Sequence, residues 1–385
     1  MARATGTFRV SRFAGEDARA FVPFHLPPAD PPLAIDGTLA ELHAEALAAV
    51  GRLSVAGSMV PNADWFVYGF VRKEAVTSSR IEGTRATLRD VATFEATRRA
   101  GDAGDVHEVS NCVDAIAYAR RQIARSTGLP LSGRLLREAH RRLMRGAPGR
   151  GKQPGAFRTS QNWIGGSRPG NARFVPPPPD VVPEAMAQLD RWLHVDDPLP
   201  PLVRAGLAHV QFEIIHPFLD GNGRVGRLLI TLLLEHWGVM RPALLYLSVA
   251  FHRRRPEYYA RLAGVHTRGD WEGWTAFFLE CVREAAEDGV AVARRLNTLL
   301  GECRGKLMRG RGATIGAMRL LELLPAHPVV TQPRVTRLLR TTKPTALKAM
   351  GALIDAGILR EMTGRQRDRV YAFHRYLTTL AGEDD

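Results

Sequence analysis

The sequence predicts a mainly α-helical protein with a β-hairpin flap and a C-terminal winged helix-turn-helix domain. Three observations support this fold class. Apolar residues recur at three- and four-residue spacing through most of residues 39–297, as in helices that bury one face. Gly, Pro, Ser and Asn interrupt that pattern in residues 157–175, which favours a hairpin. After residue 312, three short helical stretches precede two alternating stretches, 357–361 and 369–373, which are typical of strands.

Residues 1–35 are rich in proline and short on periodicity, so we expect an arm lying over the body. Helices are expected over 39–99, over 106–143 with a break at 128–130, and over 183–297. We divide the chain into an N-terminal arm with a helical region, a central core and a C-terminal domain, which cover residues 1–105, 106–300 and 310–385.

Composition excludes several classes of protein. The 385 residues are 45% apolar, which is enough for a sizeable core and for two or three domains. Three scattered cysteines without a CxxC pair argue against a thiolate zinc site and a disulfide framework. The chain has no run of 18 apolar residues and no apolar stretch at its start, so we expect a cytoplasmic protein without a membrane span or signal peptide.

The net charge of +14 is a weak indication of a nucleic-acid partner. Only five of the 53 basic residues are Lys, and such an arginine bias is what a GC-rich genome produces whatever the function. The basic excess in residues 304–385 is local, with fifteen Lys or Arg against seven Asp or Glu. It indicates either contact with DNA phosphates or a basic surface of a protein-docking or dimerisation module.

Residues 216–227 read His-Pro-Phe-Leu-Asp-Gly-Asn-Gly-Arg-Val-Gly-Arg and are the most informative stretch. Residues 203–214 before them carry apolar residues on one helical face, which predicts an amphipathic helix. Residues 228–234 after them are apolar on almost every side, which predicts a buried helix. The motif is therefore expected as the turn between two helices, at a helix N-terminus whose unpaired N–H groups attract an anion.

Two side chains of the motif suit a reaction at a phosphate. His216 precedes a proline and is kept out of the helical region, so its ring can point into a cleft and take a proton from a hydroxyl. Asp220 offers oxygen to Mg²⁺, which prefers few carboxylates together with substrate phosphates. Phe218 is expected to fix the loop in the core.

The other motif residues suit phosphate binding. Gly221 and Gly223 allow the backbone close to a phosphate. Arg224 and Arg227 lie on one face of a helical turn and can hold further oxygens. Each element alone is most often structural, but their occurrence within twelve residues favours function.

The order of constrained residues from His216 to Arg227 resembles the signature of the Fic family of AMP-transferring enzymes. The resemblance implies a Fic-type helical core in residues 106–300 that transfers AMP from ATP to a Ser, Thr or Tyr hydroxyl of a protein and releases pyrophosphate. It implies His216 as the base, Asp220 as the Mg²⁺ ligand and ATP as the nucleotide. The implied nucleotide contacts from the motif are Gly221, Asn222, Gly223, Arg224, Val225, Gly226 and Arg227.

Residues 78–83, Ser-Ser-Arg-Ile-Glu-Gly, place a glutamate at the end of a helix before a glycine cap, where the helix dipole disfavours it unless a cation is near. An exposed Glu in a fraying turn is the plain alternative. Ser78, Glu82 and Gly83 resemble the inhibitory motif of the family, in its class with an N-terminal inhibitory helix. The resemblance implies that Glu82 lies at the nucleotide, pairs with Arg227 and prevents productive seating of the γ-phosphate.

Two further segments gain a role from the resemblance. An ordinary surface hairpin is the alternative for 157–175, but the family uses such a flap to align its target by strand addition, which places Asn162, Trp163 and Ile164 beside the cleft. Tyr258 and Tyr259 suit core packing, whereas the resemblance implies that one of them contacts adenine.

Alternative functions stay open from the sequence. The chain could be a DNA-binding transcriptional regulator with a Fic-like sensor body, using residues 310–385, or a pure interaction scaffold. Removal of AMP from a modified target is a further alternative. The expected partner is a protein with a Ser, Thr or Tyr hydroxyl, including the chain itself, and a homodimer is one alternative for the oligomeric state because relatives of this layout often pair.

Overall fold

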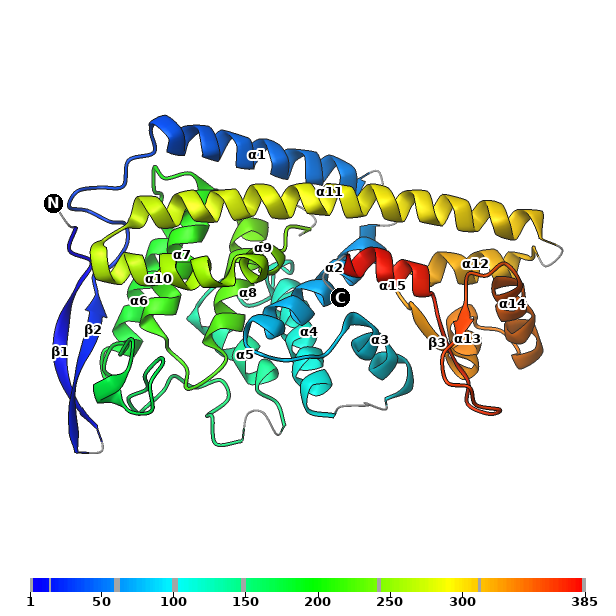
Figure 1. The fold of residues 1–385 in the computed structure, drawn as a ribbon, viewed down its shortest axis with the longest axis horizontal. Coiled ribbons are helices and arrows are strands. Elements are labelled where there is room, and N and C mark those ends of the chain that lie inside the picture. The colour runs from blue at the N-terminus through cyan, green and yellow to red at the C-terminus, as the bar shows by residue number, and fades with distance from the viewer. Residues whose placement is uncertain are drawn as a thin grey trace. The chain divides into compact units, whose positions relative to one another are not determined.

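The computed structural model describes residues 3–13, 15–58, 63–98, 103–146, 150–240, 244–310 and 313–382. The chain forms two compact units, each assembled from segments distant in sequence (Figure 1). The first unit combines Met1–Gly51 with Asn111–Ala286, and the second combines Arg52–Ser110 with Glu287–Asp385. The sequence-based division, in contrast, used three contiguous regions. Helices α1 Gly37–Ser58, α4 Ala103–Ile123 and α11 Trp271–Arg309 each contribute residues to both units.

A β-hairpin opens the first unit. Strands β1 Gly6–Phe13 and β2 Glu16–Pro23 are antiparallel, with Gly6 opposite Pro23 and Phe13 opposite Glu16. The expected proline-rich arm is therefore wrong for this stretch. The reason is that alternating residues of β2, Ala18 and Ala20, are buried, and alanines give a weak periodic signal.

Helices fill the rest of the first unit. Besides parts of α1, α4 and α11, these are α5 Gly133–Leu143, η2 Pro169–Asn171, α6 Val182–His194, α7 Pro201–Ile215, α8 Asn222–His236, α9 Ser248–Arg253 and α10 Arg255–Arg268. The predicted break at 128–130 is confirmed, because α4 ends at Ile123 and α5 begins at Gly133.

Helices α7 and α8 form the centre of this unit. Helix α8 is buried through Leu234, as predicted. The prediction that the preceding helix is amphipathic is wrong, because α7 is also buried on nearly every side, including the polar residues Arg204 and His209. Gly206 explains how α7 can be so enclosed: a Cβ there would lie 2.9 Å from the ring of Phe278.

The second unit holds the C-terminal elements together with two helices from the N-terminal half. Its elements besides parts of the shared helices are α2 Ala63–Ile81, α3 Leu88–Thr97, α12 Ile315–Leu323, β3 Val329–Thr331, α13 Gln332–Leu339, α14 Lys343–Asp355, β4 Arg360–Glu361, β5 Val370–Ala372 and α15 His374–Ala381. The strands form an antiparallel sheet in the order β3-β5-β4. The three expected helices and two expected strands are present, whereas β3 and α15 were not expected.

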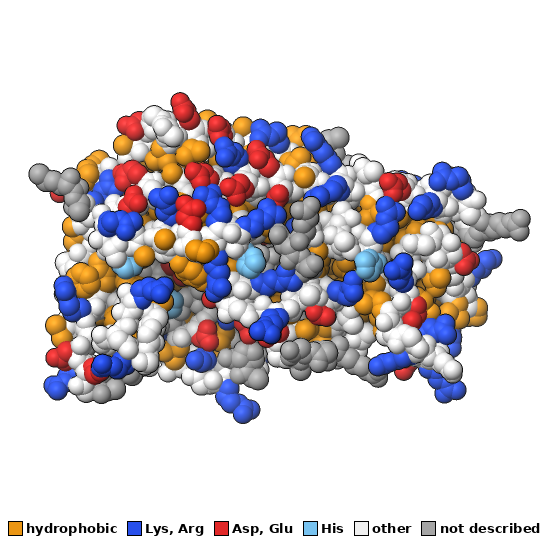
Figure 2. Space-filling view, viewed as in Figure 1, with side chains coloured by type: hydrophobic (Ala, Val, Ile, Leu, Met, Phe, Trp, Pro, Cys, Tyr) orange, Lys and Arg blue, Asp and Glu red, His pale blue; other side chains and the backbone are white. Residues whose placement is uncertain are grey.

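Surface charge and hydropathy add two findings. Lys and Arg side chains are spread among Asp and Glu over the visible face, so the net charge alone marks no single binding surface (Figure 2).

Among the helices that the structure describes, none is long and apolar enough to cross a membrane.

A polar cluster ties α2, α3 and α13 together within the second unit. The carboxylate of Glu95 forms an ion pair with Nη2 of Arg72 at 2.8 Å, and it accepts hydrogen bonds from Nε of Arg72 at 2.9 Å and from the hydroxyl of Tyr68. Arg334 donates to the backbone carbonyl of Glu95 and, at 3.0 Å, to Nδ1 of His327. Burial raises the pKa of Tyr68, which keeps its hydroxyl protonated and able to donate.

Glu95→Ala is expected to lower the free energy of unfolding of the second unit by about 3–5 kcal/mol, because it leaves the mostly enclosed guanidinium of Arg72 without its partner. The Arg72 and Glu95 side chains are only 13% and 20% exposed. Glu287→Ala is the matched control: Glu287 pairs with Arg52 in the same unit, but both side chains are 55% exposed. That control should cost less than about 1 kcal/mol. Urea unfolding followed by circular dichroism measures both, and equal losses would contradict the assigned role of Glu95.

Candidate functional site

The predicted motif forms the turn between α7 and α8, and its first residue has an unusual backbone. His216 ends α7 in the left-handed conformation, with φ 49°. A non-glycine residue holds such a conformation only where its surroundings enforce it. Arg158 supplies that constraint: its Nε donates to the His216 carbonyl and its backbone N–H donates to the Pro217 carbonyl, both at 2.9 Å. Burial lowers the pKa of Arg158 to about 10, so it stays charged near neutral pH.

The orientation of the His216 ring assigns its two nitrogens. Nδ1 lies 3.3 Å from the carbonyl oxygen of Glu213. Because a carbonyl can only accept, Nδ1 carries the proton in the neutral ring, and the lone pair is at Nε2. The ring is half-buried. A neutral imidazole with its lone pair at Nε2 can accept a proton, and the role of His216 as a base stays a prediction.

Asp220 is the exposed acid of the turn. Its side chain is 45% exposed, and Oδ1 accepts the N–H of Gly221 at 2.6 Å and lies 3.8 Å from Nη2 of Arg224. Within the described ranges, no group of three or more His, Cys, Asp or Glu could hold a metal ion. Mg²⁺ is usually held by one or two carboxylates together with substrate phosphates and water, and Asp220 as its ligand stays a prediction.

Asn222 closes the loop on itself. Its Oδ1 accepts the N–H of Phe218 at 2.9 Å, and its Nδ2 donates to the Phe218 carbonyl at 2.8 Å. Both side chains are buried, and Phe218 fixes the loop in the core as predicted. These two bonds shape the turn and leave one N–H of Nδ2 for a further acceptor, so contact of Asn222 with a phosphate stays a prediction.

His140, which sequence reasoning missed, supports the loop from below. Its Nδ1 accepts the N–H of Gly155 at 2.9 Å, so Nε2 carries the proton and donates to the Asp220 carbonyl at 3.0 Å. The ring stacks on Phe218 with a centroid separation of 3.8 Å. Burial lowers the pKa of His140 to about 4, which keeps the neutral ring that this pair of bonds requires. No signal in the sequence connects His140 to a motif 80 residues away.

The glycines of the motif have different functions. Gly221 caps α8 with φ 76°, a conformation that favours glycine, and a Cβ there would lie 3.2 Å from Leu143 and from Met144. Gly226 faces α7 instead, where a Cβ would lie 2.3 Å from Oε1 of Glu213. The missing side chain allows α7 and α8 to pack closely, and contact of Gly226 with a nucleotide stays a prediction. Gly223 lies in the first turn of α8 and is half-buried.

Arg224 and Arg227 lie three residues apart on the first turns of α8 and are both buried. Burying a guanidinium is costly unless charged or hydrogen-bonding groups compensate it. Two guanidiniums near the N-terminal end of a helix are groups of the kind that bind a polyphosphate. Val225 between them is a core residue.

The predicted inhibitory motif lies where α2 ends. Helix α2 stops at Ile81, Glu82 is exposed in the turn that follows, and Gly83 has φ 110°. Ser78 is buried. The expected glycine cap and terminal glutamate are therefore present. Glu82 belongs to the second unit and Arg227 to the first, and their pairing stays a prediction.

The expected hairpin over 157–175 is reduced to one β-bridge, between Ile164 and Phe174. It does not form two strands, because Pro169–Asn171 is a 3-10 turn and most of the segment has no regular structure. Asn162 donates to the Phe218 carbonyl at 3.2 Å, which places it beside the loop.

The outer side of this segment rests on β2. Trp163 packs on a small cluster of buried residues from β2 and the segment: Ala18, Ala20 and Val175. The N–H of Phe21 donates to the Val175 carbonyl at 2.9 Å. Ile164 is exposed. The N-terminal hairpin therefore supports the segment in which the target-docking residues were predicted.

The two tyrosines of α10 differ in exposure. Tyr258 is 1% exposed, and its hydroxyl lies 2.9 Å from Nε2 of the buried His209. It also stacks on Phe251 in the core. Tyr259 is 40% exposed. Tyr259 is consequently the better candidate of the pair for contact with a base.

Acidification is expected to destabilise the first unit through its buried histidines. Burial lowers the pKa of His140 and His266 to about 4 and that of His209 to about 3. In the unfolded chain they titrate near the ordinary value of 6.5, so the unfolded state binds more protons below that pH. Stability is fully present above pH 6.5 and falls towards pH 4. Urea unfolding across this range measures the effect, and a flat profile would contradict the neutral buried state.

Comparison with known proteins finds similarity to one family. A sequence model of the Fic/DOC family matches residues 130–234, and a model of the Fic/DOC N-terminal region matches residues 40–121. These two regions of the chain are similar to the Fic/DOC family. It is 29% identical over 213 residues to the protein adenylyltransferase Fic of Drosophila erecta, covering 54% of this chain and 39% of that protein. It is 31% identical over 144 residues to a probable protein adenylyltransferase of Aquifex aeolicus, covering 37% and 35%. The match thus spans about two fifths of these relatives at most.

Solved structures share the fold. A Fic family protein from Desulfovibrio desulfuricans superposes with a TM-score of 0.59 at 24% identity, covering 89% of this chain and 97% of that one. Fic-1 of C. elegans gives a TM-score of 0.51 at 20% identity, covering 67% and 74%.

Proposed function

We propose that this protein transfers AMP from ATP to a Ser, Thr or Tyr hydroxyl of a protein and releases pyrophosphate. The observation that carries the proposal is the His216 imidazole, held by a strained backbone next to the N-terminus of α8 with its Nδ1 engaged by a carbonyl. This leaves Nε2 as the basic atom. Homology to protein adenylyltransferases supports the same reaction class.

The reaction needs few steps from the protein. Nε2 of His216 accepts the proton of the target hydroxyl as the hydroxyl oxygen bonds to the α-phosphorus of ATP. The bond from that phosphorus to the bridging oxygen breaks, and pyrophosphate leaves with the electron pair. The amides at the start of α8 and the guanidiniums of Arg224 and Arg227 stabilise the phosphate charge throughout. Asp220 would hold Mg²⁺, which neutralises phosphate oxygens when bound.

The segment around Ile164 provides the proposed docking site for the target. Its backbone pairs with Phe174 at one bridge only, so an extended target segment could add main-chain hydrogen bonds beside it. Asn162 connects this segment to the loop that carries the base. Main-chain pairing would place a hydroxyl near His216 without demanding much target sequence.

The test uses ATP labelled at the α-phosphate and, in parallel, at the γ-phosphate, with the chain itself as the first target. AMP transfer predicts that only the α-label stays on protein, and that mass spectrometry finds AMP on a Ser, Thr or Tyr oxygen. Label from the γ-phosphate on the protein would indicate phosphoryl transfer and overturn the proposal. A chelator of divalent cations should abolish labelling. A Glu82→Gly variant is run alongside, so that inhibition does not hide the reaction.

Inhibition by Glu82 is the second part of the proposal. The carboxylate follows α2 directly, where the dipole of that helix disfavours a negative charge and favours pairing with a cation. Arg227 is the proposed partner, and the pair would compete with the γ-phosphate of ATP for the same guanidinium.

A further inference from the structure

The second unit contains a helix-turn-helix that the transfer reaction does not use. Helices α13 and α14 are separated by residues 340–342, and Arg340 takes the left-handed conformation at the end of α13. A turn of three to four residues between two packed helices is typical of this motif. In DNA-binding examples the second helix enters the major groove with its N-terminal residues at the base edges. Helix α14 holds that position here.

Helix α14 buries one face and presents the other to solvent. Its inward residues form the core of the domain and are Ala346, Ala349, Met350 and Leu353. Lys343, Leu347 and Lys348 on its first turns are exposed, and Leu347 is 48% exposed. The exposed face therefore combines cations with one apolar side chain. Lysines can hold phosphates or guanine edges, and an apolar side chain can contact the methyl group of thymine.

The loop between β4 and β5 presents a second row of cations. Arg365, Arg367 and Arg369 are all exposed. The loop has defined turns, with positive φ at Gly364 and at Asp368. Its shape is also stabilised by hydrogen bonds, since Nε of Arg369 donates to the Arg365 carbonyl at 2.8 Å.

Glu361 at the base of the loop is occupied by local hydrogen bonds. Its carboxylate accepts the hydroxyl and the N–H of Thr363 and the N–H of Gly364 at 2.8 Å. These bonds, the Thr363 hydroxyl first, lower the pKa of Glu361. The Glu361 carboxylate is therefore bound by groups of its own loop, while the three arginine side chains of the loop are exposed.

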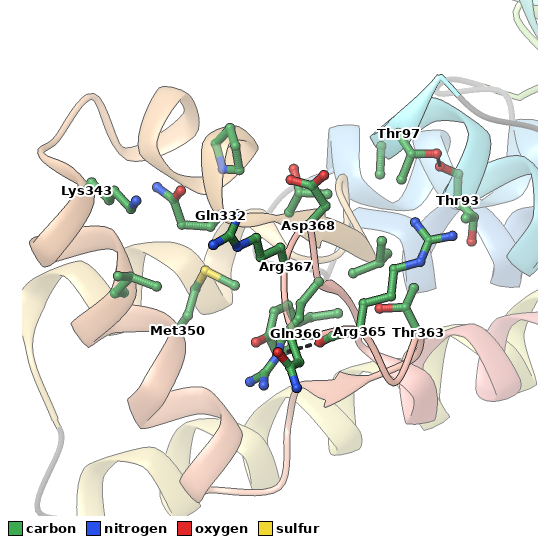
Figure 3. A pocket seen from close by; sticks show the side chains of 17 residues that line it. Thr93, Thr97, Gln332, Lys343, Met350, Thr363, Arg365, Gln366, Arg367 and Asp368 are labelled. Atoms are coloured by element: carbon green, nitrogen blue, oxygen red, sulfur yellow. Dashed lines mark hydrogen bonds between the residues drawn. The ribbon is translucent and has the colours of Figure 1, made fainter.

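A groove of about 900 Å³ separates the two rows. Figure 3 shows Lys343 at the start of α14 on one side and Arg367 of the loop on the other, with Gln332 between them in this view. Among its lining residues, four are cations and one is an acid: Lys343, Arg365, Arg367 and Arg369 against Asp368. On the face that Figure 2 shows, by contrast, basic and acidic side chains are mixed. A groove with cations on facing walls is complementary to a polyanionic strand.

We propose that this surface, formed by α14 and the β4–β5 loop, binds duplex DNA. Helix α14 enters the major groove, and the loop arginines contact phosphates of the adjacent backbone. An acidic protein segment would match the charge, but it would not account for an exposed helix that begins with a lysine and follows a helix-turn-helix connection. The activity is separate from AMP transfer, because neither His216 nor Asp220 takes part.

The test measures binding of the full-length chain to a labelled mixed-sequence duplex of about 25 base pairs by fluorescence anisotropy, across roughly 50 to 200 mM salt. Affinity should fall steeply with salt. The triple variant Arg365→Gln, Arg367→Gln, Arg369→Gln should bind at least tenfold more weakly, with a salt slope reduced by about 0.9 for each phosphate that the variant no longer neutralises. Leu347→Asp, on the exposed face of α14, should also bind at least tenfold more weakly.

A matched control removes the same charge elsewhere. Arg121, Arg125 and Arg134 are exposed residues of the first unit, outside the groove, and their triple Gln variant should bind DNA as the wild type does. All variants change exposed side chains, and unchanged thermal unfolding verifies that they fold. Equal loss in both triple variants would reduce the effect to net charge and overturn the proposal. Absence of binding by the wild type, or stronger competition by polyglutamate than by DNA, would overturn it as well.

Discussion

His216→Ala is expected to lower AMP transfer by about 10²–10⁴-fold, the usual contribution of a positioned general base. The variant removes Nε2, the atom proposed to accept the proton of the target hydroxyl. It leaves the Arg224 and Arg227 guanidiniums and the start of α8 in place, so the affinity for ATP should change little. Initial rates of labelling from α-labelled ATP, together with calorimetric titration of ATP, separate the two quantities.

Two further variants distinguish a base from a structural residue. His216→Asn keeps a hydrogen-bonding side chain but cannot act as a base near neutral pH, so it should be as inactive as the alanine variant. Arg158→Met removes the bond from Nε to the His216 carbonyl, and it should lower the rate without changing which atom accepts the proton. Full activity of His216→Asn would show that the imidazole is not the base, and the proposed reaction would need another acceptor.

The turn between α7 and α8 could be predicted from the sequence because its residues are adjacent along the chain. The order of His216, Asp220 and the arginines depends on local spacing, and the helix after them is recognised as buried because residues 228–234 are almost all apolar. The supports of this turn could not be predicted. Arg158 contacts His216, which lies 58 positions further along the chain, and His140 contacts Asp220, which lies 80 positions further along. Only the tertiary fold creates these contacts.

The errors in the fold have physical causes of the same kind. Helix α7 shows apolar periodicity on one face, but its other face is buried too. Gly206 on that helix leaves room for the ring of Phe278, and the polar side chains of Arg204 and His209 are themselves buried, which a hydropathy pattern does not predict. Strand β2 buries alanines, which carry little hydropathy signal. The compact units join segments that are far apart in sequence, and no local pattern reports which helices share a core.

Glu82→Gly is expected to raise AMP transfer by about 10- to 100-fold. The proposed pair of Glu82 with Arg227 competes with the γ-phosphate, and a coupling of about 1–3 kcal/mol between two such states corresponds to a factor of 5–150. Affinity for ADP should stay the same, because ADP lacks the group that the carboxylate displaces. Rates with α-labelled ATP and titrations with ADP on the same preparations measure the two effects.

Matched variants separate charge from flexibility. Glu82→Gln keeps the side chain's size and removes its charge, so it should activate nearly as much as glycine. Arg85 is exposed and lies three residues after Glu82. Arg85→Gly therefore makes the segment after α2 more flexible and keeps the Glu82 carboxylate, so the rate of AMP transfer should stay unchanged. If Arg85→Gly activates as strongly as Glu82→Gly, the turn restrains the reaction through its rigidity. In that case the glutamate is not a competitor of the γ-phosphate.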